Sequence, residues 1–209
     1  MIVLYPIILS TSINLGIYSS VSIKMMVDTM DDEALWGTDD KEKTSKALLC
    51  MLGLGVGEIA GSIAFGRVMD KCPIKCTVLI NILAATIGYG SLLLFGAFYE
   101  FSFPLAILMT TSWGVQDAGI VCLLQSMLGF QFESQTTPFS VYKFMQSLLI
   151  FVVFYIESLI ETQTAYLVYF CICYALAILA WVVFYNFFDV MSKEDVQRMR
   201  FASSSIVTT

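Results

Sequence analysis

The sequence predicts an all-α membrane protein with six transmembrane helices. Of its 209 residues, 58% are hydrophobic and only 13% are charged, and the mean hydropathy is +0.80. Soluble domains carry about a quarter charged residues, so this composition argues against a water-soluble enzyme. One crossing of the hydrocarbon core takes about 20 apolar residues, which leaves room for roughly six or seven crossings. Because backbone groups in lipid must bond to one another, each crossing is expected to be a helix.

The apolar stretches are separated by short polar segments, apart from one long acidic segment between the first two. We expect the six helices at residues 2–27, 47–69, 76–99, 103–132, 138–160 and 165–188. The domain organisation that follows is a six-helix bundle over residues 1–188, an acidic extracytoplasmic loop at 28–46 and a polar cytoplasmic tail at 189–209. A span that begins directly after Met1 suggests that sequence is missing upstream.

Lysine and arginine collect on the cytoplasmic side of membrane proteins. They favour cytoplasmic N- and C-termini here, with three lysines of the acidic loop on the other side. The basic residues expected in the cytoplasm are Arg67, Lys71, Lys75, Lys193, Arg198 and Arg200. The result is an integral, multi-pass protein whose composition fits the plasma membrane and endomembranes equally.

Charge and residue usage also bear on chemistry. The net charge is −6 and the chain has no histidine, which argues against nucleic acid as a partner and against histidine-based catalysis or metal binding. Cys72 and Cys76 form a C-x3-C pair with no second pair nearby, so we expect no metal site. With no Ser/His, Cys/His or metal constellation, we expect neither a cofactor nor an enzymatic activity.

A glycine strip marks the second span. Gly53, Gly57 and Gly61 recur every four residues, which aligns them along one face of a helix. Without side chains they allow a second backbone to approach closely, as small residues do in membrane helix pairs. We interpret the strip as a helix-packing surface.

Two carboxylates lie near the middle of predicted spans. Glu58 is about halfway along the second span, and Asp117 is at a similar depth in the fourth. A charge at the bilayer centre costs about 2.5–3.5 kcal/mol on insertion scales, so each needs a partner, a proton or water. One interpretation is a proton- or solute-responsive group in a central cavity. The other is a carboxyl that fixes helix packing, in the case of Glu58 through Ser62 one turn later.

Other polar or aromatic residues accompany Asp117 in the fourth span. Trp113, Gln116 and Gln125 are expected to line the same cavity wall. Lys143 and Glu157 lie within about two turns of a helix end, so we expect them to extend towards the membrane surface.

The segment after the second span resembles a known transporter motif. Gly66, Asp70, Lys71 and Lys75 match the G-x-x-x-D-[RK]-x-G-x-[RK] loop of the major facilitator superfamily, while Pro73 stands where the family has glycine. The resemblance implies that these four residues form a cytoplasmic gating loop.

Later motifs are similar to those of the Unc-93-like branch of that superfamily. The matching stretches are Trp113–Ala118, Gln125–Gly129 and Pro138–Leu148, in the same order and spacing. The similarity lies with the C-terminal six helices of a twelve-helix protein. It implies a half-bundle made of two inverted three-helix repeats.

Two functions remain open at this point. The first is solute transport by alternating access, together with a second six-helix half, a second copy or another membrane subunit in the lipid bilayer. The second is a non-transporting regulator or trafficking partner of another membrane protein or ion channel. If the protein is a transporter, we expect a hydrated cavity around both carboxylates. If it is a regulator or trafficking partner, we expect a closely packed interior.

Overall fold

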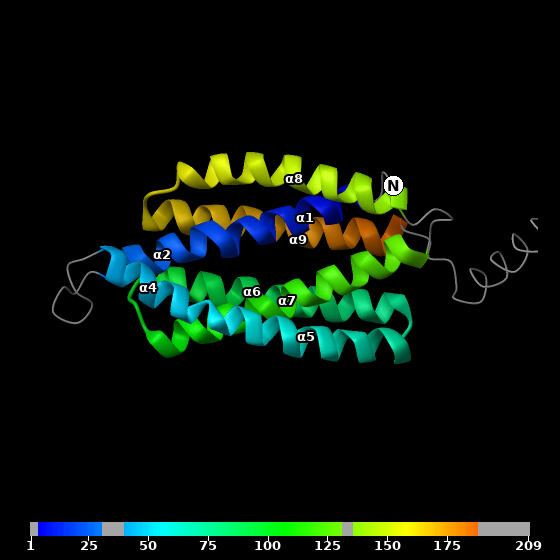
Figure 1. Cartoon of the computed structure of the whole chain (residues 1–209), viewed down its shortest axis with the longest axis horizontal. Helices are drawn as coiled ribbons and strands as arrows, with labels where there is room; N and C mark the ends of the chain where they lie inside the picture. Colours follow the sequence, from blue (N-terminus) through cyan, green and yellow to red (C-terminus); the bar gives the residue numbers. More distant parts are fainter. Residues whose placement is uncertain (1–3, 31–39, 131–135, 188–209) are drawn as a thin grey trace, which may run out of the picture.

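The computed structural model describes residues 4–30, 40–130 and 136–187, and every regular element in these ranges is helical (Figure 1). Six helices are long and apolar enough to cross a membrane. Their bounds are Tyr5–Asp28, Lys41–Lys71, Ile74–Phe98, Phe103–Gly129, Thr136–Ser158 and Gln163–Asn186. The prediction of six such helices is confirmed, and they match an integral, multi-pass membrane protein. The predicted tail at 189–209 lies outside the described residues.

Two of the spans are composite. The first consists of α1 (Tyr5–Gly16), the π-helix η2 (Ile17–Val21) and α2 (Ser22–Asp28). The second consists of α4 (Asp40–Cys50) and α5 (Leu52–Lys71), with a break at Met51. The remaining spans are α6 (Ile74–Phe98), α7 (Phe103–Phe130), α8 (Thr136–Ser158) and α9 (Gln163–Phe187).

The acidic segment is shorter than the sequence predicted. Helix α4 already begins at Asp40, so the lysines expected in a loop lie on a helical extension of the second span. Glu42 and Lys46 form a 2.9 Å ion pair there, four residues apart. A glutamate four residues before a lysine favours helix, which explains the extension. Residues 31–39 lie outside the described part of the chain.

The connection between the second and third spans is also shorter than expected. Helix α5 continues through Lys71, the turn consists of Cys72 and Pro73, and α6 begins at Ile74. The backbone at Cys72 and Pro73 is extended. A residue before proline is pushed out of the helical region, which ends α5 at this point.

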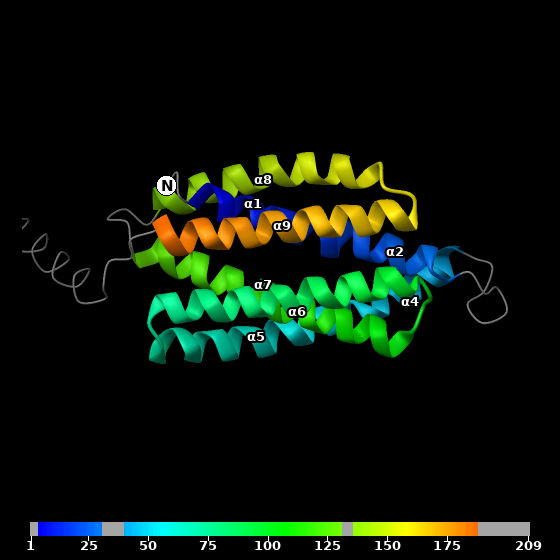
Figure 2. The ribbon, with the colours of Figure 1, turned by 180° about the vertical axis from the view of Figure 1, so that it is seen from behind.

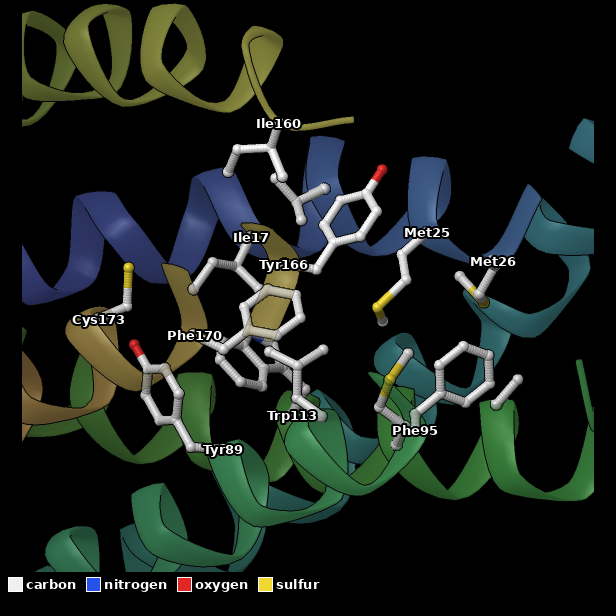
Figure 3. Close-up of a cluster of buried hydrophobic side chains, with 14 of the residues drawn as sticks. Ile17, Met25, Met26, Tyr89, Phe95, Trp113, Ile160, Tyr166, Phe170 and Cys173 are labelled. Atoms are coloured by element: carbon white, nitrogen blue, oxygen red, sulfur yellow. The ribbon is translucent and has the colours of Figure 1, made fainter. Parts of the chain in front are cut away.

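The six spans run up and down in two groups. Helices α1, α8 and α9 lie on one side and α5, α6 and α7 on the other, and the view from behind shows the same grouping (Figures 1 and 2). The pairs in extensive contact are α1 with α8 and α9, α7 with α5 and α6, and α6 with α9. Between the groups lies a core of buried aromatic and sulfur-containing side chains. Figure 3 shows Trp113, Tyr166 and Phe170 among the side chains of this core.

Candidate functional site

The glycine strip lies against α7, where the packing prediction requires it. A Cβ on Gly53 would meet the hydroxyls of Thr110 and Thr111, and one on Gly57 would overlap the backbone of α7. A Cβ on Gly61 would come within 2.9 Å of α7 as well. The backbones of α5 and α7 therefore touch along much of their length, which brings side chains beside the strip close together.

Glu58 and Asp117 are brought together by this contact. A Cβ on Gly114 of α7, three residues before Asp117, would meet the backbone nitrogen of Glu58 on α5, and the two carboxylates repel each other electrostatically. Both also act electrostatically on the hydroxyl of Tyr18, which η2 supplies from the first span. Each of the two acids is half-buried. In the described part of the chain, no basic side chain forms an ion pair with either of them. We call Tyr18, Glu58 and Asp117 the carboxylate site.

A row of polar side chains leads from this site along α8. The hydroxyl of Tyr142 lies near Asp117, Thr11 and Gln146. The ammonium group of Lys143 donates a 3.0 Å hydrogen bond to Oε1 of Gln146 and lies 5.0 Å from the centre of the Tyr142 ring. The row therefore extends from the neighbourhood of the carboxylate site to an exposed lysine near the start of α8.

The other residues predicted beside Asp117 do not share one wall. Trp113 is buried, with its ring 4.8 Å from that of Tyr89 in an edge-to-face arrangement. It lines a very small pocket together with Tyr18. Gln116 lies between α6 and α7 against Gly88, and Gln125 is exposed. The structure therefore brings only Trp113 near the carboxylate site.

Ser62 does not support Glu58 in the way proposed from the sequence. Its hydroxyl lies beside the thiol of Cys122 on α7. Both interpretations of Glu58, as a cavity residue and as a packing residue, therefore stay predictions.

Glu157 is a second buried carboxylate, and the prediction that it reaches the membrane surface is wrong. Only 1% of it is exposed. The reason is that the last turn of α8 packs against the middle of the first span, where Gly16 leaves room for the carboxylate. The spacing of residues along the fifth span could have predicted that Glu157 is buried. Tyr142, Gln146, Val153 and Glu157 are all buried and follow helical spacing along one face of α8.

The predicted gating residues lie at one end of the bundle. Gly66, Asp70 and Lys71 are exposed on the last turns of α5, and not in a loop. Lys75 lies in the first turn of α6, with its ammonium 5.6 Å from the centre of the Tyr185 ring on α9. These residues therefore surround the Cys72–Pro73 turn.

At the end of the bundle opposite the Cys72–Pro73 turn, hydrogen bonds connect different spans. Lys24 donates to the carbonyl of Ile160 (2.6 Å), and Gln163 donates to the carbonyl of Gly96 (3.1 Å). The backbone N–H of Phe101 donates to Thr29 (3.3 Å). This end thus joins the first, third and last spans and the turn before α7.

No group of three or more metal-binding side chains is present within residues 4–30, 40–130 and 136–187. Comparisons with known protein families, curated proteins and solved structures return no match to this chain. The function is therefore argued from the carboxylate site itself.

Proposed function

We propose that this chain is one six-helix half of a secondary transporter, working by alternating access and resembling the Unc-93-like branch of the major facilitator superfamily. The observation that carries the proposal is the meeting of Glu58 and Asp117 from two helices, beside Tyr18 and without a described basic partner. On this proposal the site binds protons or a cationic solute.

The energetics of the pair support a binding role. Two like charges close together at membrane depth repel each other and also lose hydration. A proton, a cation or water relieves both penalties, whereas tight packing relieves neither. Both acids are half-buried and not sealed inside the bundle, which on this proposal leaves them open to a ligand.

The pattern of helix contacts supports inverted repeats. The first, second and third spans are α1, α5 and α6, and the fourth, fifth and sixth are α7, α8 and α9. If each span of the first set is replaced by its counterpart in the second, and the reverse, the α1–α8 contact becomes α7–α5 and the α1–α9 contact becomes α7–α6. The α6–α9 contact maps onto itself. Inverted three-helix repeats produce this exchange, and in transporters built from them the substrate binds near the midplane at the repeat interface.

A second membrane unit belongs to the proposal. Alternating access needs two bodies that move around one site. The half-buried carboxylates would otherwise meet lipid, where each charge costs several kcal/mol. A second six-helix half, a second copy of this chain or another membrane subunit is proposed to cover them.

The test uses the intact assembly purified from its native membrane in mild detergent. It is reconstituted into vesicles that contain a trapped pH-sensitive dye, and an inward proton gradient is imposed with panels of organic cations and neutral solutes outside. Proton flux and retained solute are measured together. We expect solute-dependent flux in the native assembly, reduced about tenfold or more by Asp117→Asn or Glu58→Gln.

The matched control is Glu100→Gln, which removes an exposed carboxylate between α6 and α7. It should leave the flux unchanged. If no gradient or solute produces flux, and another channel or receptor co-purifies in fixed ratio, the chain is instead a regulator or trafficking partner.

A further inference from the structure

Glu157 forms a polar site distinct from the carboxylate site. The hydroxyl of Tyr169 on α9 donates a 2.8 Å hydrogen bond to its Oε1. Its other oxygen, Oε2, is buried and has no partner with hydrogen-bond geometry among the described residues. The hydroxyl of Ser20 on η2 lies beside the carboxylate. Three spans therefore enclose one acid side chain.

The groups around Glu157 do not supply a compensating charge. From the first span it faces Ser20 and the backbone at Gly16, and from α9 it faces Tyr169 and the thiol of Cys173. Lys24 is the nearest basic residue along the first span, but its ammonium donates to the carbonyl of Ile160 instead. An ionised Glu157 would thus be an uncompensated charge inside the bundle, which is strongly unfavourable.

A proton on Oε2 would remove the uncompensated charge and would also give this oxygen a hydrogen-bond partner. The carboxyl becomes neutral, and its new O–H is a donor that the Ser20 oxygen can accept. Oε1 continues to accept from Tyr169. All polar atoms of the side chain then have partners, as buried polar groups normally do.

We propose that Glu157 is a proton-binding site of this protein, separate from the carboxylate site and joined to it by η2. Tyr18 and Ser20 lie two residues apart on this π-helix and face the carboxylate site and Glu157 respectively. Short π-helical segments occur often at functional sites. Loss of the Glu157 proton would reverse the bond with Ser20, whose hydroxyl would then have to rotate and donate to the carboxylate, and so act on the segment that positions Tyr18. The proton site does not depend on transport activity.

Infrared spectroscopy of the intact assembly in lipid nanodiscs tests this site, with pH varied across the neutral range. A protonated carboxylic acid has a carbonyl band that an ionised carboxylate lacks. We expect such a band at neutral pH in the native protein, its loss in Glu157→Gln, and its retention in the Glu58→Gln, Asp117→Asn double variant. Tyr169→Phe should keep the band and shift it to higher frequency, because the carbonyl oxygen loses a hydrogen bond.

Two results would overturn the proposal. One is a neutral-pH spectrum in which neither Glu157→Gln nor Tyr169→Phe changes the band. The other is loss of the band when sodium chloride replaces choline chloride at constant pH, which would make Glu157 a sodium site. The Tyr169→Phe variant retains the carboxyl, so the frequency shift decides the matter even if Glu157→Gln does not fold. Failure of the transport test leaves these outcomes unaffected.

Discussion

The hydroxyl of Tyr166, on α9, donates a 2.7 Å hydrogen bond to Oδ2 of Asp28, the last residue of the first span. Tyr166 is fully buried in the core between the two helix groups (Figure 3). The bond therefore fixes the end of the first span to the beginning of the sixth.

Removing this hydrogen bond should destabilise the protein. Tyr166→Phe keeps the ring packing and is expected to lower the free energy of unfolding by about 1.5 kcal/mol, because hydrogen bonds to charged groups contribute about that much. The measurement is thermal unfolding in detergent. Tyr155→Phe is the control, since Tyr155 is 66% exposed. Equal melting temperatures for the two variants would show that the Asp28 contact adds no stability.

The α5–α7 contact should tolerate no side chain at its centre. Gly57→Ala places a methyl group into the α7 backbone, and we expect a cost of about 1–3 kcal/mol. Gly55→Ala is the matched control, because a Cβ there meets nothing within 4 Å. It should stabilise the helix by up to about 1 kcal/mol, the intrinsic preference for alanine over glycine. Both values follow from unfolding curves, and a stable Gly57→Ala protein would contradict the packing.

Asp117→Asn should leave the protein inserted and folded while changing the pH dependence of transport. The asparagine removes a charge whose burial is costly and whose neighbour Glu58 repels it. Uptake by reconstituted vesicles across a range of pH checks this. Unchanged uptake at every pH would return Asp117 to a packing role. Loss of expression in Glu58→Gln would indicate the same for Glu58.

The cysteines near the Cys72–Pro73 turn should report orientation. Cys72 and Cys76 are half-buried, and we expect a membrane-impermeant thiol reagent to label them only from the cytoplasmic side of sealed vesicles. Protease should reach the segment between the first two spans only from the opposite side. The basis is the distribution of basic residues. Cys50 is buried and should stay unlabelled until the protein is denatured. The reverse pattern would overturn the proposed topology.

The mass of the assembly should exceed that of one chain. The carboxylate site needs a cover in the membrane, so we expect native mass spectrometry to find this chain with a second copy or another membrane subunit. An active, monodisperse species of 23.3 kDa would refute the need for a partner.

Hydropathy was enough to predict the spans, because the cost of unpaired backbone in lipid leaves helices as the available structure for these apolar runs. It placed the ends less well. The helix from Asp40 depends on local pairs such as Glu42 with Lys46, and the stop at Lys71 depends on Pro73. Such local effects are small beside the burial of 20 apolar residues, so hydropathy does not register them.

The candidate site was only partly predictable. Glu58 and Asp117 were identified because charge in a membrane is costly wherever it occurs. Gln116 lies against α6 and Gln125 is exposed, and hydropathy does not show this because the direction in which a helix residue faces depends on tertiary packing. Glu157 was misjudged because its distance from a helix end says nothing about where that end lies relative to Gly16.

The π-helical segment in the first span has a consequence for changes in chain length. An α-helix turns about 100° per residue, so deleting a residue from its interior rotates everything on one side of the deletion. Within Ile17–Val21 the wider turn holds a surplus residue, and a deletion there converts the segment to ordinary α-helix. Asn14 and Met25 would keep their directions. The span therefore tolerates the loss of one residue at η2 without rotating its two ends relative to each other, and only residues within the segment, Tyr18 and Ser20 among them, would change direction.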